Sequence, residues 1–103
     1  MSYWHEFLQT RTVKELNSIR RKGVMMEDIM AEVIEFMGVR CVDRYDPPGA
    51  AFMYHETFWA NADGDKMVWA EARVGMPTLA VSFKTKEKYL ALRKHLIGKG
   101  LVR

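Results

Sequence analysis

Three segments between residues 52 and 83 alternate between apolar and polar positions. They are rich in aromatic and β-branched side chains, which favours half-buried strands. Asp63-Gly64 separates the first segment from the second and is typical of a hairpin turn, because Gly adopts positive φ and Asp bonds its own backbone. Gly75 and Pro77 interrupt the chain before the third segment. We therefore expect a three-stranded antiparallel meander with helices on one face.

Residues 24–37 carry the clearest helical pattern in the chain. At 100° per residue their apolar side chains cover about half of the helix circumference, and Asp28, Glu32 and Glu35 fall on the other side. The apolar positions are Met25, Met26, Ile29, Met30, Val33, Ile34 and Met37. Gly38 is suited to end this helix. The methionines fit a protein core, because Met fills irregular gaps, and they also fit an adaptable binding groove or the seam of a homodimer.

Two shorter helices are predicted before this one, over residues 2–10 and 12–22. Thr12 and Glu15 match a capping box, in which each side chain satisfies a free backbone N–H of the other residue. The three cations at residues 20–22 suit the negative end of the helix dipole.

A C-terminal helix is expected to begin after Thr85, because Tyr89, Leu92 and Leu96 recur at helical spacing. Residues 39–45 suit a short additional strand. The predicted fold class is therefore α+β, with N-terminal helices, a three- to four-stranded antiparallel meander and a C-terminal helix packed on one sheet face. A chain of 103 residues fits a single domain, residues 1–103.

Composition and targeting signals favour a cytoplasmic protein. Apolar residues make up 49% and charged residues 28%, as in an ordinary folded domain. Every apolar run is well short of the roughly 20 residues that a membrane span needs, so we expect no membrane partner. The N-terminus lacks the pattern of a secretory signal. The single cysteine, Cys41, has no internal disulfide partner, which favours a reducing compartment.

One face of the predicted sheet carries more aromatic surface than a solvated face requires. Leu79, Val81 and Phe83 are expected to meet the helices, which leaves Trp69 and Trp59 on the other face among polar neighbours. Such a surface is either covered by the N-terminal segment or binds a partner. The candidate partner-binding residues are Tyr54, Trp59, Trp69 and Arg73.

The net charge of +3 is unevenly distributed. Residues 1–23 hold five basic and two acidic residues, and residues 84–103 hold seven basic residues and one acidic residue. Residues 24–83 hold four basic and ten acidic residues. If the two ends lie together in the fold, they form one positive face.

This charge distribution supports an alternative hypothesis, binding of RNA or single-stranded nucleic acid. On the last helix Lys88, His95 and Lys99 fall within about 40° of one another. Tyr54 and Trp69 are aromatic residues on which bases can stack. The candidate nucleic-acid-binding residues are Arg20, Arg21, Lys22, Lys88, His95 and Lys99. A helix-turn-helix is disfavoured, because the acidic face of residues 24–37 would repel phosphates.

The chain shows no sequence signature of catalysis, of a metal site or of a cofactor. The three histidines are far apart, and adjacent strand residues such as His55 and Glu56 point to opposite faces. There is no Gly-rich phosphate loop and no nucleophile motif. We therefore expect a protein that is not an enzyme and holds no cofactor and no metal.

The first functional hypothesis is a small regulatory protein that binds another protein and inhibits or redirects it. The alternatives are the nucleic-acid-binding protein described above and a homodimer whose seam is the helix at residues 24–37. The size and methionine content also suit a small phage-encoded accessory protein, by analogy of general type only.

Overall fold

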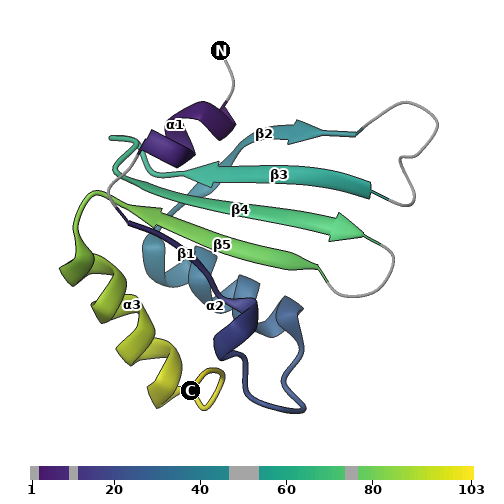
Figure 1. Cartoon of the computed structure of the whole chain (residues 1–103). Coiled ribbons are helices and arrows are strands. Elements are labelled where there is room, and N and C mark those ends of the chain that lie inside the picture. The colour runs from purple at the N-terminus through teal and green to yellow at the C-terminus, as the bar shows by residue number, and fades with distance from the viewer. Residues whose placement is uncertain (1–2, 10–11, 47–53, 74–76) are drawn as a thin grey trace.

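The computed structural model describes residues 3–9, 12–46, 54–73 and 77–103. A five-stranded antiparallel sheet has helices on both faces (Figure 1). The elements in chain order are α1 (Tyr3–Gln9), β1 (Thr12–Glu15), the 3₁₀ turn η1 (Asn17–Ile19), α2 (Met26–Met37), β2 (Arg40–Tyr45), β3 (Tyr54–Ala60), β4 (Lys66–Arg73), β5 (Thr78–Phe83) and α3 (Lys86–Gly98). The predicted α+β class is confirmed, with five strands rather than three or four.

The predicted meander is formed by β2, β3, β4 and β5, which pair in chain order. The predicted strand at residues 39–45 is β2. The β3–β4 hairpin turns where Asp63-Gly64 indicated: Gly64 adopts φ +68°, and the Asn61 N–H donates to the Lys66 carbonyl at 3.2 Å. The Asn61 side-chain oxygen also accepts from the Lys66 N–H at 3.1 Å. This closed turn fixes the register of the two strands.

The helix predicted over residues 12–22 is wrong. Thr12–Glu15 is β1, which pairs with β5 at the sheet edge, and the 3₁₀ turn η1 follows it. The Leu16 N–H donates to the Leu79 carbonyl at 2.8 Å, and the Asn17 side-chain oxygen accepts from the Leu79 N–H at 2.9 Å. These contacts between distant residues satisfy the backbone better than the local capping box would, so tertiary pairing overrides the helical signal.

The main hydrophobic core lies between the sheet and the helices α2 and α3. From α2 it takes Met26, Ile29, Val33 and Met37, and from the strands it takes mainly β4 and β5 residues. The predicted end of α2 is confirmed, because Gly38 adopts φ +65° and its N–H donates to the carbonyls of Ile34 and Glu35. This is the arrangement by which glycine closes a helix.

A second, smaller core lies on the opposite sheet face, beneath α1. Phe7 of α1 is 1% exposed and packs with a cluster of sheet residues, namely Phe58, Ala60, Met67, Trp69 and Ala80. The Ser82 hydroxyl donates to the Phe7 carbonyl at 3.0 Å. Of the two interpretations of the aromatic sheet face, the structure therefore shows the one in which the N-terminal segment covers it.

Truncating Phe7 tests whether α1 is an integral layer. We expect Phe7→Ala to lower the free energy of unfolding by about 3 kcal/mol, because a fully buried aromatic side chain is lost. Leu8, on the same helix, is 53% exposed, and Leu8→Ala should change stability by less than about 0.5 kcal/mol. Urea denaturation measures both values. Equal effects of the two substitutions would show that α1 does not pack as described.

An ion pair ties the β3–β4 turn to α3, and its strength should depend on pH. Lys88 Nζ donates to Asp65 Oδ2 at 2.7 Å, and Asn61 Nδ2 donates to the other oxygen. The Lys88 hydrogen bond is the main cause that lowers the pKa of Asp65 from 3.8 to about 2. Since the folded state depresses this pKa, the stabilisation is present above pH 3.8 and is lost as the pH falls to about 2.

We therefore expect Asp65→Asn to be less stable than the wild type at neutral pH, with a difference that shrinks below pH 3.8. Asp63→Asn, an exposed change in the same turn, is the control and should have the smaller effect. Urea denaturation at a series of pH values measures both. A difference that stays constant down to the acid limit would rule out the ion pair as its source.

Candidate binding surfaces

A groove of about 480 Å³ opens between the N-terminal half of α2 and the sheet. Its volume lies in the range typical of ligand pockets, roughly 300–1,000 Å³. Its lining comprises Met26, Glu27 and Met30 of α2; Cys41 and Arg44 of β2; His55, Thr57 and Trp59 of β3; Ala70 and Ala72 of β4; and Pro77, Thr78 and Leu79 at the start of β5. Apolar side chains and polar groups thus line the same opening.

The groove exists because the helices cover only part of their sheet face. Among the described residues, the strand members of the main core come from β4 and β5, with Trp59 as the contribution of β3. A bulge between Cys41 and Asp43 then shifts the register of β2. Cys41 pairs with Trp59 and Arg44 with Thr57, so both β2 residues share the groove side of the sheet.

Trp59 lies on the face opposite to the one predicted for it. In the β3–β4 register Trp59 pairs with Val68, a core residue, and Phe58 pairs with Trp69. Residues that pair directly share a face, so Trp59 and Trp69 lie on opposite faces of the sheet. The prediction was wrong because alternation orders the side chains within each strand but does not set the register between strands.

The structure does not place the other candidate partner-binding residues on one surface with Trp59. Trp69 is 8% exposed and lies under α1, with its ring centroid 5.0 Å from that of Trp4. The indole N–H of Trp69 is buried without a hydrogen-bond partner among the described residues. Tyr54 and Arg73 pair with each other in the register of β3 and β4, but their side chains lie outside the described residues.

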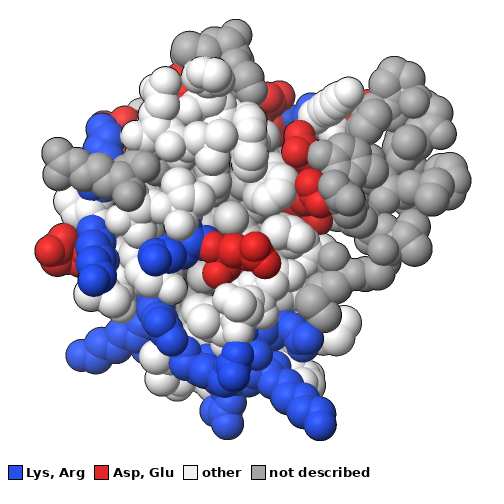
Figure 2. Space-filling model, viewed as in Figure 1, with Lys and Arg blue, Asp and Glu red and all other residues white. Residues whose placement is uncertain are grey.

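The two basic ends of the chain lie side by side. The Arg21 N–H donates to the Leu101 carbonyl at 3.0 Å, and the Arg103 N–H donates to the Ile19 carbonyl at 2.8 Å. Figure 2 shows that lysine and arginine side chains gather at this end of the molecule. The exposed cations of the segments that meet here are Arg21, Lys22, Lys94, Lys99 and Arg103, which we call the basic pole.

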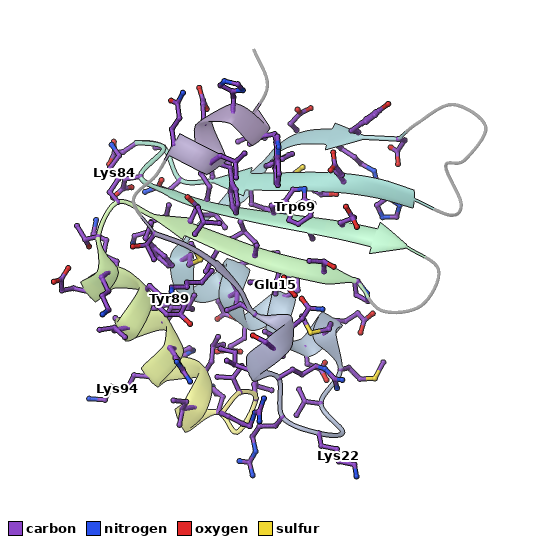
Figure 3. All side chains as sticks on the ribbon, viewed as in Figure 1. Glu15, Lys22, Trp69, Lys84, Tyr89 and Lys94 are labelled. Atoms are coloured by element: carbon purple, nitrogen blue, oxygen red, sulfur yellow. The ribbon has the colours of Figure 1, made fainter. Side chains whose placement is uncertain are left out.

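The sequence predicted only part of the basic pole. Lys94 lies outside the group of Lys88, His95 and Lys99 that helical periodicity places together. Arg103 joins the pole through backbone pairing of the last residues, a contact that helical periodicity does not reveal. Figure 3 shows Lys22 and Lys94 at the same end of the molecule, with Lys84 at the other end of α3.

Two predicted nucleic-acid-binding residues are used elsewhere in the fold. Lys88 makes the ion pair with Asp65 described above. Arg20 is partly buried, and its Nη1 donates to the Val24 carbonyl at 2.7 Å. The side-chain stripe of Lys88, His95 and Lys99 therefore does not present three free cations to one ligand.

His95 joins α3 to α2. Its Nε2 lies 2.7 Å from Glu32 Oε1, and Lys99 Nζ lies 3.8 Å from the same oxygen. The hydrogen bond with His95, followed by the charge of Lys99, lowers the pKa of Glu32 below its ordinary value of 4.5. The His95 ring also stacks on Phe36, with centroids 4.3 Å apart, and Phe36 is 43% exposed. The half-exposed ring of Phe36, stacked on the partly buried ring of His95, thus lies near Lys99.

Neither a metal site nor a membrane span is found in the part of the chain that the structure describes. Within residues 3–9, 12–46, 54–73 and 77–103, no three histidine, cysteine, aspartate or glutamate residues are grouped so that they can hold a metal ion. None of the helices in these ranges is long and apolar enough to cross a membrane. Comparison of the chain with models of known families, with curated proteins and with solved structures found no match.

Cys41 provides a chemical test of access to the groove. It is the chain's single cysteine, it is exposed, and it lines the opening. Met30→Trp places a larger side chain on the opposite wall, so we expect modification of the native protein by a disulfide reagent to slow by about threefold or more. Met25→Trp, next to the groove, should leave the rate unchanged. Equal rates in the two variants would show that Met30 does not border the path to Cys41.

Proposed function

We propose that this protein is a non-catalytic regulator that binds another protein by receiving an apolar side chain of its partner in the groove. The observation that carries this proposal is the juxtaposition of Met26 and Met30 with Trp59 around one opening. Methionine side chains adapt to a ligand, because they are unbranched and polarizable. Tryptophan is enriched among residues that dominate binding energy.

The polar groups of the groove suit orientation of a bound segment. Glu27, Arg44 and His55 come from three different elements and line the same opening. Arg44 is held in place by Asp46, whose Oδ2 accepts from Arg44 Nε at 2.9 Å. Apolar surface with a few placed polar groups is the usual composition of a specific site.

Insertion of a side chain fits the structure better than addition of a strand to the sheet. The edge strand β2 carries Arg40, Asp43 and Arg44, and a bulge interrupts it after Cys41. Charges and bulges on an edge strand disfavour pairing with another chain. The partner therefore binds the face of the sheet beside α2.

We infer that binding inhibits or redirects the partner. We also infer that the protein is cytoplasmic, which the exposed free Cys41 supports. A homodimer through α2 has less support, because Ile29 and Val33 on the predicted seam are fully buried inside the molecule. A mass measurement of the purified protein decides between one copy and two.

The test compares two aspartate substitutions on α2 with one at Met25, the residue just before it. Met30→Asp should weaken binding of the captured partner by about 30-fold, because a central apolar contact is replaced by a charge. Met25 is 61% exposed and lies outside the groove lining, so Met25→Asp should bind as the wild type does. Ile29→Asp should unfold the protein, because Ile29 is 0% exposed. Circular dichroism checks the fold of each variant.

The measurement uses the tagged protein to capture partners from lysate treated with nuclease, followed by calorimetric titration of the purified partner. If partner binding through the groove is correct, prior binding also protects Cys41 from modification. Equal loss of binding in Met25→Asp and Met30→Asp would contradict the groove as the binding site.

A further inference from the structure

The fold concentrates positive charge at a place that the groove does not use. The basic pole joins cations from the segment before α2, from α3 and from the end of the chain, which the backbone bonds of Arg21 and Arg103 hold together. Among the described residues, Arg21, Lys22 and Lys94 make no ion pair. Lys99 Nζ lies 3.8 Å from Glu32 Oε1, and that oxygen is already paired with His95 Nε2 at 2.7 Å.

This arrangement leaves the charge of the basic pole largely without compensation inside the molecule. Clustered like charges repel one another, and a polyanion that binds them relieves the repulsion. The acidic residues of the chain lie mainly elsewhere, as in the β3–β4 turn and on β2. On α2, Glu32 contacts His95 and Lys99, whereas Glu27, Asp28 and Glu35 are exposed. A bound anion must therefore avoid the side of the basic pole where Glu32 lies.

An aromatic surface adjoins these cations. A shallow depression on α3 is lined by Ala91, Lys94, His95, Gly98 and Lys99. The ring of His95 stacks on the half-exposed ring of Phe36. Phosphate-binding cations and an exposed ring side by side are the combination by which proteins bind single strands, because every base has a face that can stack.

We propose that the basic pole binds single-stranded RNA or DNA, with the phosphates on its lysine and arginine side chains and a base against Phe36. A duplex fits less well, because its bases are already stacked and the ring gains no partner. An acidic segment of another protein would use the same cations but would not need the ring. This site is independent of the groove, and its ligand is of a different class.

The first experiment measures binding of fluorescein-labelled 20-nucleotide oligo(U) and oligo(dT) by fluorescence polarisation at several salt concentrations. If about four phosphates are contacted, at ~0.7 counterions each, affinity should fall about 50-fold between 50 and 200 mM salt. A preference for oligo(U) would assign the site to RNA. Equal affinities for oligo(U) and oligo(dT) would mean that the site accepts single-stranded RNA and DNA alike. A flat salt dependence, or no binding at 50 mM salt, would overturn the proposal.

Charge reversal tests the location of the site. Lys22→Glu with Lys94→Glu should weaken binding by about tenfold or more and flatten the salt dependence. The matched control, Lys84→Glu with Lys86→Glu, reverses the same number of charges at the start of α3, where Lys86 is the first helical residue and Figure 3 shows Lys84. It should weaken binding much less. Equal losses would mean that the response reflects net charge, and the basic pole would not be the site.

Substitution of Phe36 distinguishes nucleic acid from an acidic protein. Phe36→Ala should weaken binding by about fivefold or more, whereas Phe36→Trp should retain it. Leu90→Ala, on an apolar side chain of α3 with similar exposure, is the control. If polyglutamate competes as well as oligo(U) and Phe36→Ala has no effect, the ligand is an acidic protein segment. Met30→Asp should bind oligo(U) as the wild type does. Nucleic-acid binding by the basic pole is therefore tested separately from partner binding by the groove.

Discussion

The register between β3 and β4 is the constraint on which the rest of the structure depends. The turn that runs from Asn61 to Lys66 sets Phe58 opposite Trp69 and Trp59 opposite Val68. A shift by one residue would exchange the faces of every side chain on one strand. The hydrogen bonds of Asn61 and the positive φ of Gly64 prevent that shift, so a short polar turn decides where the large aromatic side chains lie.

Each sheet face is then completed by a different part of the chain. On the face of Trp69, α1 supplies Phe7 and closes the smaller core. On the face of Trp59, α2 and α3 pack over β4 and β5 and leave the side toward β2 uncovered, where the groove opens. The segment before α2 is also paired with the last residues of the chain, beyond α3, and these backbone bonds create the basic pole. Both candidate binding surfaces are therefore consequences of how two helices cover a wider sheet.

Local signals in the sequence predicted the elements that local physics determines. Alternation identified β3, β4 and β5, Gly38 the end of α2, and Asp63-Gly64 the hairpin turn. Residues 12–22 were misassigned because pairing of β1 with β5 outweighs their helical pattern. The position of Trp59 and the membership of Lys94 and Arg103 in the basic pole depend on strand register and on contacts between the chain ends. Periodicity within one segment carries no information on either.

The most direct test of this account is a two-dimensional nuclear Overhauser measurement on the three tryptophan side chains. With the hairpin register described, the Trp69 indole should show contacts to Trp4, whose ring centroid is 5.0 Å away, and the Trp59 ring should show contacts to the Val68 methyl groups. Contacts of Trp59 to Trp4, with Trp69 against the core residues of α2, would mean that the hairpin register is different. The groove would then not exist as described.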